Sequence, residues 1–219
     1  MNMHSDLALE YRHLEEVSST NDFLRAYEPM ADVTVLSASY QTNGRGQMGN
    51  TWISNSGENA LFSILVCLSA LKASDGFVLS QAMALSIKEV LDGYLEGISI
   101  KWPNDIYCGD EKICGTLIEN VLMGKFVGRS VIGSGINVNQ TEFPGGLAAP
   151  PTSLRIYINR IVPPADIIRS VAGRFALYYE EVQAGSYDHI REEYHRHLYL
   201  RGEKRCFQDE TGTFAGVIS

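Results

Sequence analysis

The sequence lacks both a membrane-spanning segment and a secretory leader. Its longest apolar stretch, ALFSILVCLSAL at residues 60–71, is too short to cross a bilayer and is interrupted by Ser63 and Ser69. The N-terminal residues, MNMHSDLALEYRHLEE, do not combine a basic start with an apolar run, as a signal peptide would. These absences predict a cytoplasmic protein with no membrane partner.

Positive charge is scarce as well. The chain has 18 Lys and Arg residues against 26 Asp and Glu residues, which gives a formal net charge of −8. Binding along a nucleic-acid backbone depends on clustered Lys and Arg that replace counterions. We therefore expect no nucleic-acid partner, and any phosphate site in this chain must be local.

Cysteine is sparse, and its four copies are widely spaced. Cys67, Cys108, Cys114 and Cys206 form no C-x-x-C pair, a pattern that predicts free thiols in a reducing compartment. Cys67 and Cys114 lie within apolar runs, so we expect both side chains to be buried. The cysteines therefore indicate neither a disulfide framework nor a zinc site.

The segments that are present alternate between strand-like and helix-like patterns. Alternating and β-branched residues predict strands at 11–17, 32–40, 61–68, 98–102, 104–108, 112–120 and 126–138. Helical spacing of apolar residues predicts helices at 74–96, 164–182 and 187–200, and another helix should follow the capping residues SSTN at 18–21. Because several connections suit hairpins, we expect an α+β fold with a mixed, largely antiparallel sheet flanked by helices. The last residues predict one hairpin of a small β module.

A glycine-rich stretch, YQTNGRGQMGNTW at 40–52, contains the letter pattern G-x-G-x-x-G. A dinucleotide fingerprint requires a helix to begin at these glycines, because its N–H groups hold the pyrophosphate. Here Gly49 leads into another strand, so the fingerprint fails. What remains is a loop with Arg45 between two glycines and Trp52 just beyond. Taken alone, it fits a surface turn with an incidental arginine slightly better than a ligand site.

Further motifs favour the ligand site. KWPND at 101–105 places a proline before Asn104 and Asp105, where it should break the strand and turn both side chains toward a cleft. The segment KICGTLIE at 112–119 follows, and GSGINVN at 133–139 is a strand opened by glycines that ends in amides. Each could be a glycine-bearing strand edge, but together they indicate one site.

In this order the motifs KWPND, K-x-x-G-x-L-x-E and G-x-G-I-N-x-N resemble the catalytic part of biotin protein ligases. The similarity begins near SSTN and covers roughly residues 10–200. It implies a mixed sheet with packed helices, related to lipoate ligases, followed by a small SH3-like β domain. On this basis we expect residues 1–200 to form the catalytic domain and residues 201–219 to begin a terminal β domain that is incomplete.

The resemblance implies a reaction in two steps. Biotin's carboxylate attacks the α-phosphorus of ATP to give biotinyl-5′-AMP and pyrophosphate, and a lysine of a biotin carboxyl carrier domain then attacks the mixed anhydride. The growing charge on phosphate oxygens must be stabilised by cations and N–H groups shielded from water. Lys112 and Arg45 are the expected catalytic cations. Magnesium is expected to screen the triphosphate, with Asp105 as a candidate contact.

The resemblance also implies which residues bind each substrate. The residues expected to hold biotin are Ser19, Thr20, Gln41, Gly44, Arg45, Lys112 and Gly115. The residues expected to face the nucleotide are Arg45, Trp52, Asn104, Lys112 and Asn137. Loop 42–51 is expected to order over the adenylate and exclude water. Lys101 is expected either to orient Asp105 or to pair elsewhere on the sheet.

Two departures from the family pattern carry expectations of their own. Many relatives have a second arginine two residues after the first, and here that position is Gln47, which supplies less charge to hold the adenylate. We nevertheless expect biotinyl-5′-AMP to dissociate slowly. Too few residues precede the motifs for a helix-turn-helix domain, so we do not expect a DNA-binding repressor.

Two other functions fit the same fold. A lipoate or octanoate ligase or transferase would need a longer, wholly apolar tunnel, and it leaves KWPND without a reason. A non-catalytic biotin sensor would keep the pocket without the chemistry, which the presence of Lys112 and Arg45 disfavours. The sequence does not reveal the oligomeric state, although exposed sheet edges are compatible with a homodimer.

Overall fold

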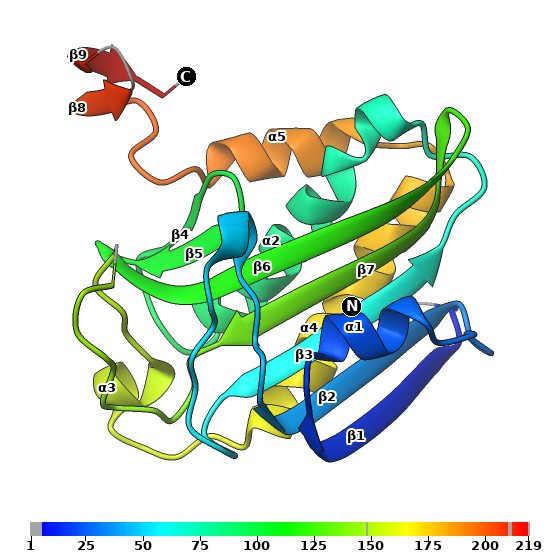
Figure 1. The fold of residues 1–219 in the computed structure, drawn as a ribbon. Helices are drawn as coiled ribbons and strands as arrows, with labels where there is room; N and C mark the ends of the chain where they lie inside the picture. Colours follow the sequence, from blue (N-terminus) through cyan, green and yellow to red (C-terminus); the bar gives the residue numbers. More distant parts are fainter. Residues whose placement is uncertain (1–5, 148, 210–211, 219) are drawn as a thin grey trace.

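The computed structural model describes residues 6–147, 149–209 and 212–218. A seven-stranded sheet dominates the chain, in the order β1-β2-β3-β7-β6-β5-β4 (Figure 1). Its strands are β1 (Leu9–Val17), β2 (Val33–Gln41), β3 (Ala60–Cys67), β4 (Ile98–Lys101), β5 (Asp105–Cys108), β6 (Glu111–Met123) and β7 (Phe126–Ile136). The pair β1–β2 is parallel and the other neighbouring pairs are antiparallel, which confirms the mixed, largely antiparallel sheet.

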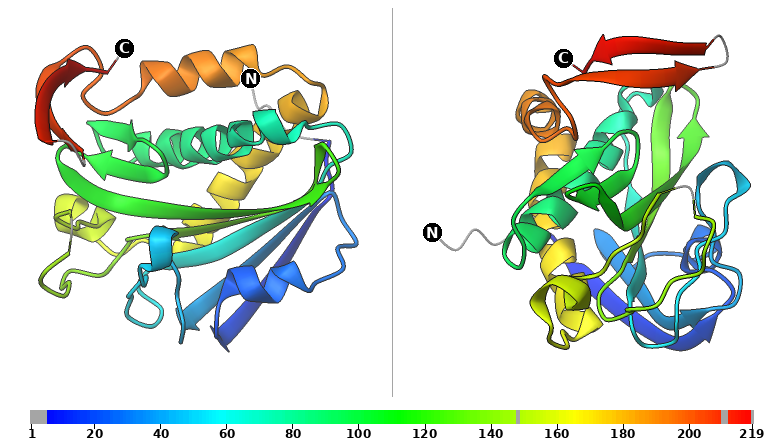
Figure 2. Two further views of the ribbon diagram at one scale, coloured as in Figure 1. Left: turned by 45° about the horizontal axis from the view of Figure 1, so that its top comes forward. Right: turned by 90° about the vertical axis from the view of Figure 1, so that its left-hand side faces the viewer.

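Helices cover both faces of this sheet, as Figure 2 shows. One face carries α2 (Phe77–Asp92), α4 (Pro164–Gln183) and α5 (Asp188–Arg196), and the opposite face carries α1 (Thr20–Arg25). A short helix, α3 (Leu154–Ile158), was not predicted, because a single turn after two prolines is too brief to show a helical period. No helix in the described ranges is both long and apolar enough to span a bilayer.

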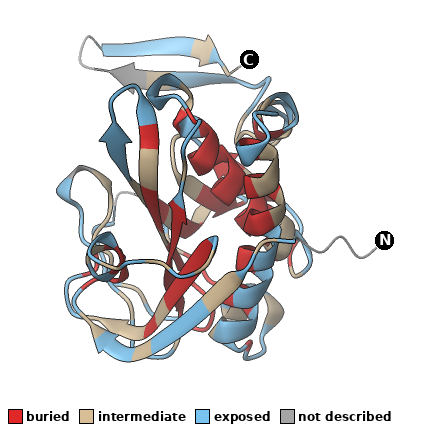
Figure 3. Ribbon diagram, turned by 90° about the vertical axis from the view of Figure 1, so that its right-hand side faces the viewer, coloured by how far each residue is buried: buried red, intermediate tan, exposed pale blue. Residues whose placement is uncertain are grey.

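The main core lies between the sheet and the helices α2 and α4. Strand β3 alternates Phe62, Ile64 and Val66 toward this core, where they meet Met83 of α2 and Phe175 of α4. Figure 3 shows the buried residues concentrated along these elements. A smaller apolar cluster on the other face joins α1 to the sheet through the buried side chains of Leu24, Leu36, Leu65 and Val131.

The helix α1 begins where the sequence predicted. Ser19 is its N-cap, and its hydroxyl oxygen accepts a hydrogen bond from the backbone N–H of Asp22 at 3.4 Å. The short helix therefore starts directly at the capping motif. This start brings the hydroxyl of Thr20 to 2.7 Å from that of Ser63 on the interior strand β3.

The helix predicted at residues 187–200 ends before residue 200. Helix α5 stops at Arg196, and the next residues run beside β4 instead. The N–H of Ile100 donates to the carbonyl of His197 at 2.9 Å, and the N–H of Tyr199 donates to the carbonyl of Ile100 at 2.8 Å. An edge strand with free backbone groups therefore competes with continuation of the helix. Beyond this segment, β8 (Lys204–Asp209) and β9 (Gly212–Val217) form the predicted hairpin.

One prediction about cysteine is confirmed and one is wrong. Cys114 is fully buried, and this burial raises the pKa of its thiol to about 12. Cys67 is exposed, contrary to expectation, because it ends β3 on the face of Leu65, two residues beyond the cluster that α1 covers. An apolar run in the sequence therefore does not reveal where the covering helix stops.

Candidate active site

The floor of the site is a patch of glycines on adjacent strands. Gly115 of β6 pairs with Gly135 of β7, and Gly133 lies two residues away on the same face. A Cβ atom at Gly133 would lie 2.1 Å from Oδ1 of Asn21, and one at Gly135 would lie 2.5 Å from the ring of Trp52. The glycines therefore let two polar-tipped side chains lie directly on the sheet.

A tight hairpin built from residues 44–52 brings Trp52 to this floor; we call it the glycine hairpin. The N–H of Gly46 donates to the carbonyl of Asn50 at 2.7 Å, and the N–H of Trp52 donates to the carbonyl of Gly44 at 2.9 Å. A Cβ at Gly44 would lie 2.6 Å from the carbonyl oxygen of Trp52, so this glycine is required by the turn itself.

Two cavities meet beside the indole of Trp52. The first cavity, of about 310 Å³, lies between α1, the glycine hairpin and the glycine floor. The second cavity, of about 550 Å³, lies between β4, β5 and the segments at residues 143–147 and 149–151. The residues that line both are Asn50, Thr51, Trp52, Asp105 and Lys112. A ligand that fills both cavities would therefore pass these side chains.

One wall of the first cavity is a chain of hydrogen bonds. Both the N–H and the hydroxyl of Thr20 donate to Oε1 of Gln41, at 2.8 Å and 3.1 Å. The hydroxyl of Ser63 lies 2.7 Å from the hydroxyl of Thr20 and 2.6 Å from Oδ1 of Asn21. These bonds fix the orientation of Thr20. They use only the amide oxygen of Gln41, so its amide N–H groups can donate to a ligand. The wall can therefore offer both donors and acceptors to a ligand.

Lys112 and Asp105 form an ion pair where the cavities meet. Nζ of Lys112 lies 2.7 Å from Oδ1 of Asp105, and their side chains are 29% and 18% exposed. The ammonium also lies 5.9 Å from the centre of the Trp52 ring. Lys101, the other candidate partner of Asp105, lies instead 5.1 Å over the ring of Tyr107. The structure thus favours the second of the two roles expected for Lys101.

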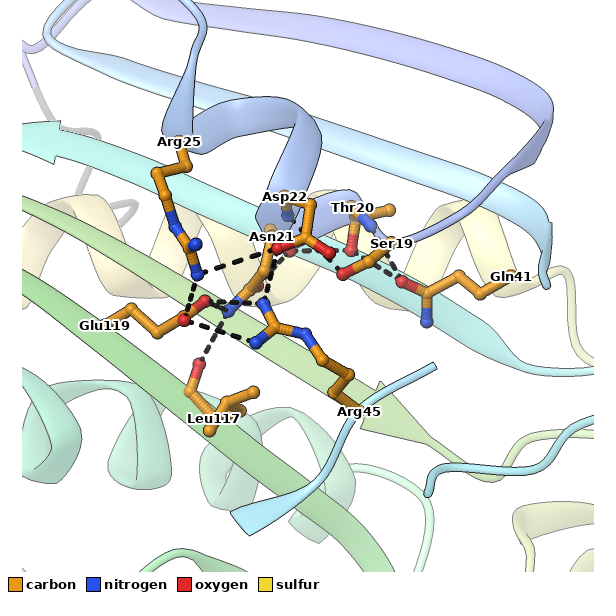
Figure 4. A network of polar contacts seen from close by, with 10 residues as sticks. Ser19, Thr20, Asn21, Asp22, Arg25, Gln41, Arg45, Leu117 and Glu119 are labelled. Carbon is orange, nitrogen blue, oxygen red and sulfur yellow. Dashed lines mark hydrogen bonds and ion pairs between the residues drawn. The ribbon is translucent and has the colours of Figure 1, made fainter. Parts of the chain in front are cut away.

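Arg45 lies in a group of charged side chains that Figure 4 shows from close by. Its Nη2 is 2.7 Å from Oδ1 of Asp22 and 3.1 Å from Oε2 of Glu119. Arg25 also pairs with both carboxylates. We call Asp22, Arg25, Arg45 and Glu119 the Arg45 cluster. Within this cluster two guanidinium groups face two carboxylates, so their formal charges cancel.

The structure brings nearly all the predicted site residues together. The first cavity is lined by the predicted biotin residues Ser19, Thr20, Gln41, Arg45, Lys112 and Gly115, whereas Gly44 lies outside its lining. Of the residues predicted to face the nucleotide, Asn137 lines the second cavity. Asn104 lines the first cavity instead, and its amide donates to the carbonyl of Thr116 at 2.8 Å.

Sequence reasoning missed several residues of the site. Ser63 has no motif around it, so nothing in the sequence singles it out. Asn21 and Glu119 are visible as the last letters of SSTN and of K-x-x-G-x-L-x-E, but no role was assigned to either. Asp22 follows a motif without belonging to it. Only its position on α1, facing Arg45, gives it a part in the site.

Metal-binding geometry is absent from the described ranges, which contain no group of three or more His, Cys, Asp or Glu side chains placed to hold an ion. Asp105 is the carboxylate shared by the two cavities. A single carboxylate suits an ion such as magnesium, which is usually bound through one or two carboxylates together with substrate phosphates. The predicted contact is therefore chemically consistent with its surroundings.

Comparisons with known proteins point to one family. The bifunctional ligase/repressor BirA of Escherichia coli is 35% identical over 130 residues, which cover 57% of this chain and 39% of that protein. The biotin–acetyl-CoA-carboxylase ligase of Paracoccus denitrificans is 27% identical over 212 residues, which cover 94% of this chain and 88% of that protein. The chain thus spans well under two thirds of the length of its Escherichia coli relative.

A solved structure gives the same result for the fold. The biotin protein ligase of Aquifex aeolicus, in complex with biotin and ATP, superposes with a TM-score of 0.79 at 27% identity and covers 95% of this chain and 86% of that one. In addition, the model of the biotin/lipoate A/B protein ligase family matches residues 14–137. The chain therefore belongs to the biotin/lipoate A/B protein ligase family.

Proposed function

We propose that this chain activates biotin with ATP and transfers it to a lysine of a biotin carboxyl carrier protein. The observation that carries the proposal is the pair of cavities that meet at Lys112, Asp105 and Trp52. A reaction that joins two substrates requires one pocket for each and a cation where their reacting atoms meet. Relatives named as biotin protein ligases support the assignment.

Biotin occupies the first cavity in this proposal. Its ureido ring has N–H donors and a carbonyl acceptor, and the wall formed by Ser19, Thr20 and Gln41 can supply partners for both kinds of group. The glycine floor seats Trp52 and Asn21 close to the sheet, so their side chains border the space for the ring. Its acid group then lies toward Lys112 and Arg45, which both line this cavity.

ATP occupies the second cavity, with its α-phosphate at the junction. Lys112 gives up part of its contact with Asp105 to the developing negative charge on the phosphate oxygens. The carboxylate oxygen forms the new bond to phosphorus, and the bond to the β-phosphate oxygen breaks as pyrophosphate leaves. When bound, magnesium neutralises phosphate charge, and Asp105 is the side chain that would contact it.

The glycine hairpin excludes water from the activated acid. Trp52 is already seated on Gly115 and Gly135, so the hairpin needs to close over a ligand rather than fold from an open loop. Gln47, which lies within this hairpin, supplies less charge to hold the adenylate than the arginine that many relatives have at this position. We expect slow release of biotinyl-5′-AMP; release as fast as that of biotin would contradict this expectation.

The domain division follows from the same proposal. In this proposal residues 1–200 form the catalytic unit and residues 201–219 belong to a small β unit, of which β8 and β9 are the described strands. The carrier domain is the protein partner. A homodimer through an open sheet edge stays a prediction, and light scattering after size-exclusion chromatography would test it in the presence and absence of biotin and ATP.

A lipoate or octanoate ligase is the nearest alternative. Such an enzyme needs an apolar tunnel, whereas Thr20, Gln41 and Arg45 place polar groups around the first cavity. Burying an apolar acyl chain against these groups would leave them without partners, which is costly. The polar wall therefore favours biotin.

One experiment separates the candidate functions. The protein is incubated with ATP, magnesium, a carrier domain and either biotin or lipoate, and pyrophosphate release and carrier mass are followed. The proposal expects release and a mass gain on the carrier lysine with biotin alone. Activity with lipoate would support the alternative ligase, and biotin binding without pyrophosphate release would support a sensor.

A further inference from the structure

The Arg45 cluster joins three separate elements beside the first cavity, which Arg45 lines. Asp22 and Arg25 lie on α1, Glu119 lies on β6, and Arg45 lies on the glycine hairpin (Figure 4). Nη2 of Arg45 reaches both carboxylates, at 2.7 Å and 3.1 Å. The side chain of Arg45 is 34% exposed and that of Glu119 is 26% exposed, so these contacts are partly shielded from water.

One donor of the same guanidinium has no partner. Nε of Arg45 is buried and makes no hydrogen bond within the described residues. Because the Nη groups contact Asp22 and Glu119, the Nε edge is the part of the planar guanidinium that remains for an acceptor. A buried donor left unsatisfied is costly, and Arg45 lines the first cavity. This donor indicates an acceptor that the ligand supplies.

Glu119 also fixes the opposite wall of the cavity. Its Oε2 accepts a hydrogen bond from Nδ2 of Asn21 at 2.9 Å, and Asn21 in turn contacts Ser63. A single carboxylate therefore orients the cation of the glycine hairpin and the first residues of α1. A glutamine at position 119 keeps an oxygen that can accept the bond from Asn21, so Glu119→Gln removes the charge that faces Arg45 and spares this second contact.

We propose that Glu119 and Asp22 are positioning residues for binding of the acid substrate. They hold the guanidinium of Arg45 in one orientation, with its Nε–H directed to an anionic oxygen of the bound acid, and they tie the glycine hairpin to α1 and β6. This inference rests on the proposed function. It assigns the carboxylates no contact with the substrate, so their effect must pass through Arg45.

The test is a steady-state and binding analysis of Glu119→Gln. Losing one charge-assisted hydrogen bond should raise the KM for biotin about tenfold, while kcat changes less than about threefold. In the ligand-free protein, amide hydrogen exchange in residues 44–52 should become faster. In an Arg45→Gln background the same Glu119 substitution should produce no further rise in KM, because the two residues act as one unit.

Glu193→Gln is the matched control. Glu193 pairs with Arg196 far from the cavities, and its side chain is 23% exposed, close to the value for Glu119. This variant should leave the KM for biotin unchanged. If Glu119→Gln fails to fold, Asp22→Asn tests the same contact from the more exposed side, with a smaller expected rise.

The outcomes separate the two hypotheses. Wild-type protein without biotin-dependent pyrophosphate release would contradict the proposed function, and hydrogen exchange would still test the tethering of the hairpin. An active wild type whose Glu119→Gln variant keeps its KM, or whose double variant shows additive effects, would overturn the positioning role. Unchanged exchange in residues 44–52 would overturn the tethering.

Discussion

The two faces of the seven-stranded sheet come from the same strands and differ in almost every property. Toward α2 and α4, strand β3 presents Phe62 and Ile64 in a continuous apolar core. Toward α1, the same strand presents Ser63, which pairs with Gly133 on β7. We call the face covered by α2 and α4 the helix face and the face covered by α1 the site face. The helix face is stabilised by many interchangeable apolar contacts, whereas the chemistry of the site face depends on a few side chains that lie over glycines.

The largest expected effect is on the helix face. Phe175 is fully buried and stacks on Tyr179 with ring centres 6.0 Å apart. Phe175→Ala should lower the free energy of unfolding by about 3–5 kcal/mol, because it leaves a cavity in a close-packed core. Chemical denaturation measures this change. If the folded fraction of the variant also lost its affinity for biotin, the two faces would be less independent than described.

The next effect is on the site face and should change chemistry more than stability. Lys112→Ala should keep the fold and weak biotin binding but slow adenylate formation by about 10²–10³-fold, because the junction loses its cation. Biotin-dependent pyrophosphate release under saturating substrates provides the measurement. Turnover at the wild-type rate would show that Lys112 does not have the assigned role.

A smaller effect should follow from filling the glycine floor. In Gly135→Ala the new Cβ would lie 2.5 Å from the ring of Trp52, so the indole must move. We expect about a tenfold weaker affinity for biotin. A shifted fluorescence spectrum should accompany it, since the only other tryptophan, Trp102, is already 67% exposed.

Gly173→Ala is the control for this substitution. Gly173 lies within α4, and a Cβ there would meet no atom within 4 Å. The change should leave biotin binding unaltered and stabilise the helix slightly. Equal effects of the two alanines on binding would contradict the idea that the glycine floor is a requirement of the site.

The smallest effect concerns pH and the end of α5. Burial lowers the pKa of His197 below its usual 6.5, with Lys88 and Arg196 acting in the same direction and Glu193 and Asp92 opposing them. The unfolded chain therefore binds this proton more readily than the folded one, and stability should fall as the pH drops below about 6.5. His197→Gln should flatten that slope in unfolding curves measured between about pH 5 and 7. If the slope were unchanged, the pH dependence of stability would come from other titratable groups.

Much of the fold was predictable because it depends on local patterns. The strands 98–102, 104–108, 112–120 and 126–138 match β4 to β7 closely, since alternation and compact turns are properties of neighbouring residues. Two predictions were wrong for one shared reason: that Cys67 is buried, and that the last helix continues to residue 200. Both features depend on which distant segment lies against a strand. The sequence pattern carries no such information.

The candidate site divides along the same line. Motifs named Lys112, Arg45 and Gly115 as members of one site, and the structure places all three at the first cavity. No motif indicated that Arg45 would be balanced by Asp22 and Glu119, which are separated from it by 23 and 74 positions in the chain. Pairings between distant charges depend on packing, which single-sequence patterns do not describe.

By itself the sequence determined the order of the strands and of the longer helices along the chain and the residue types available for chemistry, because both follow from local spacing and side-chain character. Only the tertiary structure decided which cation meets which carboxylate, where Trp52 lies and how two cavities share Lys112. Those outcomes depend on how α1, the glycine hairpin and the segments at residues 143–147 and 149–151 come together around the two cavities. Such long-range packing determines which charges are shielded from water and which remain free for a substrate.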